Sequence, residues 1–337
     1  MFAPKLTINS DAIAQNWQSL NELSSGKAAA VIKADAYGLG MNLVAPTLWN
    51  AGARMFFVAT IVEAQALSLL LPQAIIYDLS GFSAFFTDLP TNIRPVLNTM
   101  AQLKTNRHTD FALQFDTGMT RLGFDIAQLD ALTHLKPSLI MSHLACSDEP
   151  DHPMNASQLT VFKTIRAAFP NVPASFSATG GILLGSEFQF ELTRPGIGIY
   201  GGAPFIAAKP TVQMSLPIIG TRDIKAGTRI GYGGTFTAPH DMRVATLLGG
   251  YADGLLRTLS GKAKFFAGDQ ACPILGRVSM DAITINITTL NDSPTSLDLF
   301  HPTQTLNDLA NIAGTIPYEI LTSIGARYER NFSGQTQ

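Results

Sequence analysis

The fold of this chain is decided by the stretch Ala28-Ala29-Ala30-Val31-Ile32-Lys33-Ala34-Asp35-Ala36-Tyr37-Gly38. Its first five residues form a short apolar run that is typical of a buried strand, and a lysine follows directly. A doubly wound open sheet that binds a dinucleotide needs a Gly-x-Gly-x-x-Gly fingerprint after its first strand. No such fingerprint follows here, so the sequence favours a closed barrel of parallel strands, with the open sheet as the alternative.

The same unit, a β-rich apolar run followed by helical spacing, recurs along the first part of the chain. Leu159, Phe162, Ile165 and Phe169, for example, show the spacing of a helix with one buried face. The predicted strands are Ala29–Lys33, Met55–Ala59, Ala74–Leu79, Ile93–Leu97, Phe111–Asp116, Leu139–Leu144, Ala174–Ala178 and Gly196–Tyr200. Alternating strands and helices pair in parallel through right-handed crossovers. We therefore predict an α/β fold, a TIM-type (β/α)8 barrel over residues 8–204.

The character of the sequence changes after Pro204. Short strand-like runs at Met242–Leu248, Lys264–Phe266 and Ala282–Ile287 are separated by Gly, Pro, Asp and Asn. This pattern predicts a mostly β C-terminal domain over residues 205–337, to which an N-terminal strand at residues 1–7 is added.

Composition excludes several classes of protein. The chain has 337 residues, of which 46% are hydrophobic and 14% charged, with a formal net charge of −2. A charged fraction below the usual value of about 25% indicates a large buried surface or subunit interface. The small net charge gives no basic surface for nucleic acid. Neither a signal peptide nor a membrane span is predicted, so we expect a cytoplasmic protein. Cys146 and Cys272 lack metal-ligand spacing and are expected to be free thiols.

Candidate catalytic side chains stand where barrel enzymes build their sites, at the C-terminal ends of strands. These are Lys33, Asp116, His143 and Ser177, with Arg194 at the start of the predicted eighth strand. A lysine that is partly desolvated there has a lowered pKa and attacks aldehydes readily. Structural interpretations remain open: Lys33 could extend to solvent, Arg194 could pair with Glu191, and His143 could be a core histidine.

Several motifs together resemble the alanine racemase family of pyridoxal phosphate (PLP) enzymes. The segment Val31-Ile32-Lys33-Ala34-Asp35-Ala36-Tyr37-Gly38 resembles the family's PLP-lysine motif. The others follow in the family's order: Asp116-Thr117-Gly118-Met119-Thr120-Arg121-Leu122-Gly123, Ser142-His143-Leu144-Ala145, Arg194-Pro195-Gly196-Ile197, Gly231-Tyr232-Gly233, Gly250-Tyr251-Ala252-Asp253-Gly254, Gly276-Arg277-Val278-Ser279-Met280-Asp281 and Ile316-Pro317-Tyr318-Glu319. Each motif alone is weak evidence, but their order across both domains is specific.

The resemblance implies an isomerase that interconverts L-alanine and D-alanine by a two-base mechanism. Lys33 would carry PLP as a Schiff base and act as one base, and Tyr232 would act as the second. Arg194 would face the pyridine nitrogen and, because a guanidinium only donates hydrogen bonds, keep that nitrogen unprotonated. The family also implies a head-to-tail homodimer in which the β-rich domain caps the partner's barrel, and D-alanine supply for peptidoglycan.

The resemblance also implies a set of binding residues and no metal. Cofactor-binding residues would be Lys33, Tyr37, His143, Ser177, Arg194, Gly196, Ile197 and Tyr318, of which Tyr37, Ser177, Tyr318 and the amides of Gly196 and Ile197 would hold the phosphate. Substrate-binding residues would be Arg121, Met280, Tyr251 and Asp281. His143 would join a hydrogen-bond network with Arg194.

Three positions depart from the family pattern, and they leave the substrate more open than the reaction. Gln114 replaces a lysine that is often carbamylated, and we hypothesise that it orients Arg121. Phe176 replaces an asparagine, and Ser279 a cysteine; either change could alter the pocket. The alternatives are therefore a serine or broader-specificity racemase, a PLP-dependent decarboxylase and a non-catalytic PLP-binding protein. A decarboxylase would place a carboxylate, not Arg194, at the pyridine nitrogen.

Overall fold

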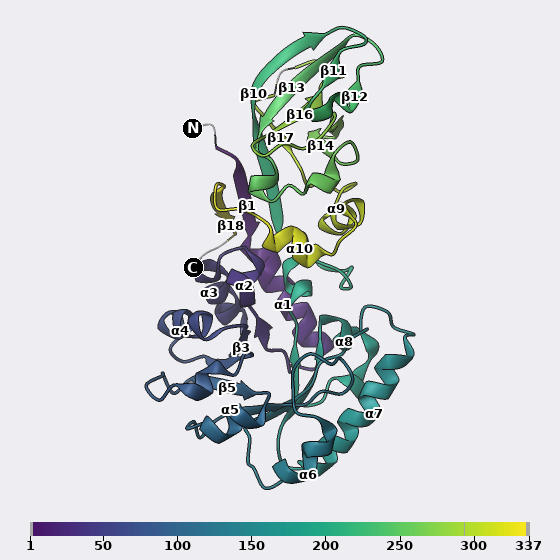
Figure 1. Cartoon of the computed structure of the whole chain (residues 1–337). Helices are drawn as coiled ribbons and strands as arrows, with labels where there is room; N and C mark the ends of the chain where they lie inside the picture. The colour runs from purple at the N-terminus through teal and green to yellow at the C-terminus, as the bar shows by residue number, and fades with distance from the viewer. Residues whose placement is uncertain (1–2, 293, 335–337) are drawn as a thin grey trace. The chain divides into compact units, whose positions relative to one another are not determined.

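The structure is a computed structural model that describes residues 3–292 and 294–334 (Figure 1). The chain folds into two compact units. The first, here called the barrel unit, is Ile13–Lys209. The second, the β unit, joins Met1–Ala12 to Pro210–Gln337. Of the predicted domain ends, residues 1–2 and 335–337 lie outside the described residues.

The barrel unit is built on eight parallel strands that pair in sequence order. They are β2 (Ala30–Val31), β3 (Met55–Val58), β4 (Ile75–Asp78), β5 (Ile93–Leu97), β6 (Ala112–Gln114), β7 (Leu139–Met141), β8 (Ala174–Ala178) and β9 (Leu192–Arg194). The barrel closes between its first and last strands, where the Ala29 amide donates to the Thr193 carbonyl at 2.9 Å and the Val31 amide to Pro195 at 3.0 Å. The predicted (β/α)8 barrel is confirmed.

One helix precedes these strands, and helices and short 3-10 turns connect them. The helices are α1 (Ser10–Leu23), α2 (Lys33–Tyr37), α3 (Met41–Ala51), α4 (Ile61–Leu70), α5 (Met100–Thr105), α6 (Leu129–Leu132), α7 (Pro153–Ala168) and α8 (Thr179–Leu184). The predicted apolar face of α7 is buried, and Phe162 stacks on Phe176 of β8 with ring centroids 4.6 Å apart. Both side chains are fully buried. Phe176 therefore packs in the core between strand and helix.

The prediction of the eighth strand was wrong in position. The strand is β9 at Leu192–Arg194, whereas Ile197–Tyr200 forms a 3-10 turn, η4. Pro195 has no N–H to donate and therefore ends the strand ladder. Arg194 consequently lies at the C-terminal end of its strand, on the side where barrel sites are built.

The β unit is organised around the long strand β10 (Val212–Ile224), which pairs with β1 (Lys5–Asn9), β13 (Met242–Leu248) and β17 (Ser296–Asp298). The remaining strands are β11 (Arg229–Ile230), β12 (Phe236–Thr237), β14 (Lys264–Ala267), β15 (Gln270–Pro273), β16 (Ala282–Asn286) and β18 (Glu329–Ser333). Strand β1 also pairs in parallel with β18, so both ends of the chain enter one sheet. The mostly β character is confirmed.

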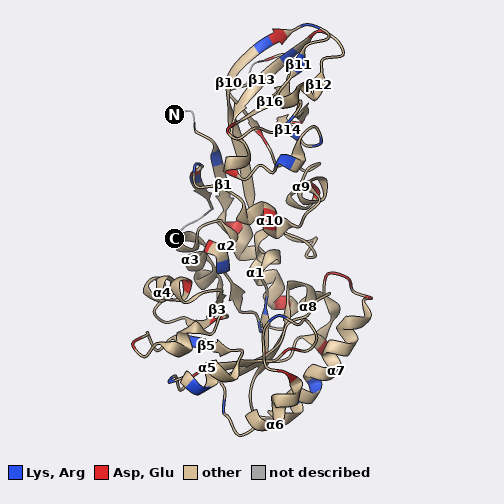
Figure 2. Ribbon diagram, in the orientation of Figure 1, with Lys and Arg blue, Asp and Glu red and all other residues tan. Residues whose placement is uncertain are grey.

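Two helices of the β unit escaped the sequence analysis, α9 (Leu306–Ala313) and α10 (Pro317–Thr322). The first has a local signal, because Thr305 and Asp308 form a reciprocal capping box at its start. Figure 2 shows Lys and Arg interspersed with Asp and Glu over both units, as expected for the small net charge. Among the described residues, every helix is too short or too polar to cross a bilayer.

Candidate active site

The predicted site residues are divided between the two units. In the barrel unit, Lys33 follows β2, His143 follows β7, and Arg194 ends β9. All three therefore stand at the same end of the barrel, because its strands are parallel. Lys33 is half-buried. Burial lowers the pKa of Lys33, the cations Arg121 and Arg194 lower it further, and Glu63 opposes them. A lowered pKa makes the amine a better nucleophile near neutral pH.

The backbone directly after Lys33 is left-handed. Ala34, Asp35, Ala36 and Tyr37 all have φ between 53° and 56°, although none of them is glycine. This conformation costs about 1–2 kcal/mol for each L-residue, so surrounding contacts must hold it. The Gly38 amide donates to Ala34 at 2.7 Å, and the Met41 amide donates to the Asp35 carboxylate at 2.7 Å. The turn buries Tyr37, whose ring stacks on Tyr200 at 4.6 Å between centroids.

Arg194 is buried, and its guanidinium forms several hydrogen bonds inside the barrel. Its guanidinium donates to Ser175 Oγ at 2.5 Å and to the Ser142 carbonyl at 2.6 Å, and it lies 3.5 Å from His143 Nδ1. Burial lowers the pKa of Arg194 to about 9, which leaves it protonated near neutrality. Since a guanidinium can only donate, Nδ1 of His143 faces it as an acceptor and the ring proton belongs on Nε2. Arg194 and His143 therefore lie within hydrogen-bond distance of each other.

The barrel environment keeps His143 neutral. Burial lowers the pKa of this histidine to about 3, and the cations Arg194, Arg121 and Lys33 add to the effect. Between about pH 3 and the model-peptide value of 6.5, the unfolded chain binds a proton at His143 that the folded chain does not. Stability associated with this histidine is therefore present above pH 6.5 and is lost as the pH falls.

A pH-dependent unfolding experiment tests this assignment. In cofactor-free protein, moving from pH 7 to pH 5 should lower the free energy of unfolding by about 2 kcal/mol more in the parent than in His143→Asn. The exposed His134 gives the control, because His134→Asn should keep the parent's pH dependence. Urea unfolding at the two pH values measures the difference. Equal pH dependence of His143→Asn and the parent would contradict a neutral imidazole in the folded barrel.

A small cradle lies between Tyr37, Gly196 and Thr179. A Cβ atom at position 196 would overlap the Tyr37 hydroxyl, so only glycine fits there. The Thr179 hydroxyl accepts hydrogen bonds from the Gly196 amide at 3.0 Å and the Gly198 amide at 3.3 Å. That hydroxyl retains its own hydrogen for donation to an anion. Ile197 follows Gly196 in the same turn.

Ser177 has another hydrogen-bond partner in the structure, and a second hydroxyl residue that the sequence analysis missed lies close to it. The Ser177 hydroxyl is fully buried and donates to the Phe188 carbonyl at 2.7 Å. Thr179 is the hydroxyl residue of the cradle. The pairing register of β8 with β9 shifts between Ser175 and Ala178, directly before it. The glycines at 180 and 181 directly after Thr179 are the local signal that could have marked it.

The loop that carries Arg121 is shaped by Asp116 and Gln114. One Asp116 carboxylate oxygen accepts hydrogen bonds from the amides of Gly118 at 2.8 Å and Thr120 at 3.0 Å. Gln114 donates to the Leu122 carbonyl at 3.3 Å. Gln114 thus contacts the backbone beside Arg121, so its orienting role toward the guanidinium stays a hypothesis.

In the β unit, the loops that carry Tyr251 and Met280 are interlocked. The Tyr251 amide donates to the Ser279 carbonyl at 3.0 Å, and the Ala252 amide donates to Met280 at 3.1 Å. A Cβ at Gly250 would overlap these same carbonyls. Three predicted side chains of this unit are strongly exposed: Tyr232 at 71%, Met280 at 52% and Tyr251 at 44%. Tyr318 of α10 is also exposed.

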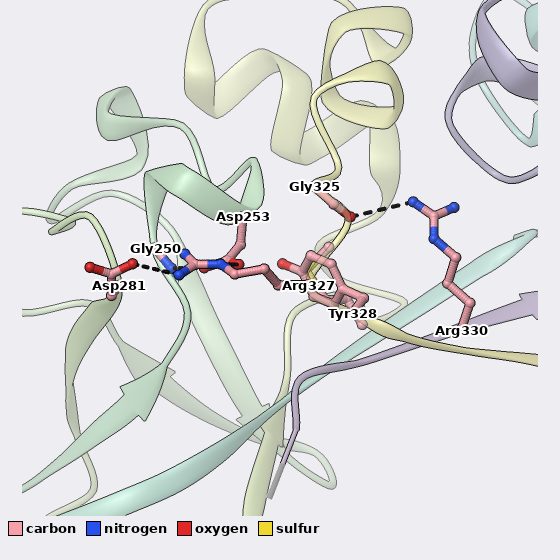
Figure 3. A network of polar contacts seen from close by, with 8 residues as sticks. Gly250, Asp253, Asp281, Gly325, Arg327, Tyr328 and Arg330 are labelled. Carbon is pink, nitrogen blue, oxygen red and sulfur yellow. Dashed lines mark hydrogen bonds and ion pairs between the residues drawn. The ribbon is translucent and has the colours of Figure 1, made fainter.

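One arginine ties these loops to the C-terminal segment (Figure 3). Arg327 donates to both carboxylate oxygens of the buried Asp253, at 2.7 and 2.9 Å, and to Asp281 at 2.7 Å. Asp253 also accepts from the Gly250 amide at 2.9 Å. The hydrogen bonds that Arg327 donates to Asp253 and Asp281 raise the pKa of Arg327, so this side chain stays a cation. Asp281 thereby has a fixed position beside Met280.

Comparison with known proteins agrees with this geometry over the whole chain. The family description "Alanine racemase, N-terminal domain" matches residues 8–204, and "Alanine racemase, C-terminal domain" matches residues 211–332. An alanine racemase of Cereibacter sphaeroides is 48% identical, covering 98% of this chain and 99% of that protein. A protein of Agrobacterium fabrum named "Alanine racemase, catabolic" is 42% identical, covering 97% and 91%.

Solved structures of alanine racemases are also similar to this chain over its length. The alanine racemase of Bartonella henselae, crystallised with covalently bound pyridoxal phosphate, has a TM-score of 0.89 and 35% identity, covering 98% of this chain and 99% of that one. The alanine racemase of Acinetobacter baumannii has a TM-score of 0.91 and 26% identity, covering 99% and 100%. Sequence motifs, barrel geometry and full-length relatives all agree, and the chain belongs to the alanine racemase family.

Proposed function

We propose that this protein is a PLP-dependent alanine racemase that interconverts L-alanine and D-alanine. The observation that carries the proposal is Lys33, a half-buried amine of lowered pKa at the end of β2, on the barrel end that also holds Arg194. Full-length relatives with the same name support it. The D-alanine would supply peptidoglycan synthesis. The cytoplasmic location expected from the sequence stays a prediction.

The residues of the barrel unit fit PLP. Lys33 supplies an amine for covalent attachment, and in the cradle of Gly196, Thr179 and Tyr37 the Thr179 hydroxyl, which accepts from the Gly196 amide, can donate to a phosphate. Arg194 would face the pyridine nitrogen and keep it unprotonated, because a guanidinium cannot accept a hydrogen bond from a protonated pyridine. Ile197, Tyr318, His143 and Ser177 complete the set that we propose for the cofactor, and Thr179 is added to it.

The chemistry requires two proton carriers. When bound, PLP withdraws electrons from the α-carbon of the amino acid and makes its proton acidic. Racemisation then needs one group that removes this proton from one face and a second that returns a proton to the other. We assign these roles to Lys33 Nζ and the Tyr232 hydroxyl. Arg121, Met280, Tyr251 and Asp281 would bind the substrate or shape its access, with Asp281 held by Arg327.

The two proton carriers belong to different units, and we propose that a homodimer brings them together. In a head-to-tail arrangement, the β unit of one subunit covers the barrel of the other. The exposure of Tyr232, Met280 and Tyr251 supports this, because large apolar side chains on a surface mark interaction sites.

A direct assay tests the reaction. Purified protein supplied with PLP and L-alanine should form D-alanine until the two isomers are equal, and L-serine should react more slowly. Chiral chromatography follows both isomers. Faster turnover of serine would keep the mechanism and change the substrate. Formation of neither D-isomer, with PLP bound, would refute the racemase proposal and favour the decarboxylase or PLP-binding alternatives.

A further inference from the structure

The carboxylate of Glu63 joins two segments that are distant in sequence. One oxygen, Oε1, accepts a hydrogen bond from the Ala34 amide at 2.5 Å. The other, Oε2, accepts from the amides of Ala59 at 2.8 Å and Thr60 at 3.1 Å. A single side chain in the first turn of α4 thus binds the residue that directly follows Lys33.

The Glu63–Ala34 contact lies at the residue where the left-handed backbone begins. Ala34 is the first of the four left-handed residues, a conformation that is unfavourable for each of them. Its N–H donates to the Glu63 carboxylate. Lys33 and Ala34 share a peptide bond, so a displacement of Ala34 displaces the Cα atom of Lys33. Glu63 is therefore placed to hold the direction of the lysine side chain.

Glu63 also supplies a negative charge that acts on Lys33. Lys33 is affected by burial and by the cations Arg121 and Arg194, all of which lower its pKa, whereas Glu63 raises it. His143, the other titratable group coupled to Lys33, is neutral near pH 7. Removal of the Glu63 charge should therefore lower the pKa of Lys33 further.

We propose that Glu63 is a positioning residue for Lys33, which ties the left-handed turn to the start of α4 and so aims the amine. This role rests on the proposed function, in which Lys33 binds PLP covalently. It goes beyond that function because it concerns how the lysine is oriented. It also explains how a turn without glycine is maintained next to a reactive side chain.

The test measures covalent capture of PLP, separately from turnover. Full-length protein is stripped of cofactor and mixed with PLP across a pH series, and absorbance gives the capture rate. Borohydride reduction and peptide mass spectrometry show whether Lys33 is the residue labelled. Glu63→Gln removes the charge and turns one acceptor into a donor, whereas Glu63→Asp keeps the charge but shortens the reach.

Thr60→Ala is the matched control. Thr60 Oγ1 accepts from the Glu63 amide at 3.3 Å in the same capping box, so its loss weakens the start of α4 and leaves the Glu63–Ala34 contact. At high pH, where Lys33 is neutral in every variant, the capture rate reports positioning alone. At lower pH, the midpoint of the profile reports the acid–base state of Lys33.

Glu63→Gln should lower the high-pH capture rate about tenfold. The amide has only one acceptor oxygen and no charge, so it cannot accept hydrogen bonds from both segments. The substitution should also shift the midpoint to lower pH. Glu63→Asp should lower the rate and keep the parent's midpoint, and Thr60→Ala should change neither.

Two different failures can be distinguished. If Glu63→Gln and Glu63→Asp both match Thr60→Ala in rate and midpoint, the positioning role is wrong, and the proposed function stands. If the parent itself captures no PLP at Lys33, the proposed function fails and this role fails with it. Circular dichroism of each variant shows whether the barrel has folded, and Glu63→Asp keeps the test valid should Glu63→Gln not fold.

Discussion

Replacement of Lys33 by alanine should abolish interconversion of L-alanine and D-alanine. The substitution removes the only amine that we assign to covalent cofactor attachment and, with it, one of the two proton carriers. Loss of a positioned base alone costs about 10²–10⁴ in rate, so we expect a fall of more than about 10³-fold in kcat. Chiral chromatography of the reaction with L-alanine measures the residual D-alanine.

The control for this variant is Lys163→Ala. Lys163 lies on α7 in the same barrel unit, is mostly exposed and has only a long ion pair with Glu187 at 3.8 Å. Its loss should leave turnover unchanged. A small primary amine added to Lys33→Ala should restore part of the activity, because it can enter the space that the side chain leaves. Activity of Lys33→Ala close to that of the parent would contradict the assignment.

The repeated pattern of strands and helices was enough to predict the barrel. Each predicted strand except the last overlaps an observed one, because a fully buried parallel strand requires a continuous apolar run. The last prediction failed because Ile197–Tyr200 is apolar and buried without being a strand. Apolar composition reports burial, and it cannot by itself distinguish a strand from a tight buried turn.

The left-handed backbone of the site had no signal of this kind. The left-handed turn after Lys33 is built from Ala34, Asp35, Ala36 and Tyr37, whereas positive φ usually appears in a sequence as glycine. Such a turn is stable only through contacts such as that of Glu63, which is 29 residues away from Ala34 in the chain.

The contact between Thr179 and the Gly196 amide was also not predicted. Ser177 lies in β8 and Thr179 begins α8, and it is the Thr179 hydroxyl that accepts from the Gly196 amide. The Arg327 network could not be predicted from the sequence either, because Asp253 and Asp281 are 74 and 46 residues away from Arg327 in the chain.

Tyr232→Phe should give the second large loss of activity. The change removes one hydroxyl and keeps the ring, so the fold and the attachment of PLP to Lys33 should persist. Racemisation should fall by about 10²–10⁴-fold, the usual contribution of a positioned acid or base. In deuterated water, proton nuclear magnetic resonance should show that the variant still exchanges the α-proton of one alanine enantiomer, the one that Lys33 serves. Equal loss of exchange from both enantiomers would contradict two separate bases.

A mixture of the two inactive variants tests whether Tyr232 acts on the partner's barrel. Lys33→Ala and Tyr232→Phe chains are unfolded together and refolded, so that mixed dimers form. If Tyr232 acts across the dimer, one of the two sites in each mixed dimer has an intact Lys33 and an intact Tyr232. Activity should then return to about a quarter of the parent's, because half of the dimers are mixed and half of their sites are complete. If Tyr232 served the barrel of its own chain, every site would lack one base and the mixture would stay inactive.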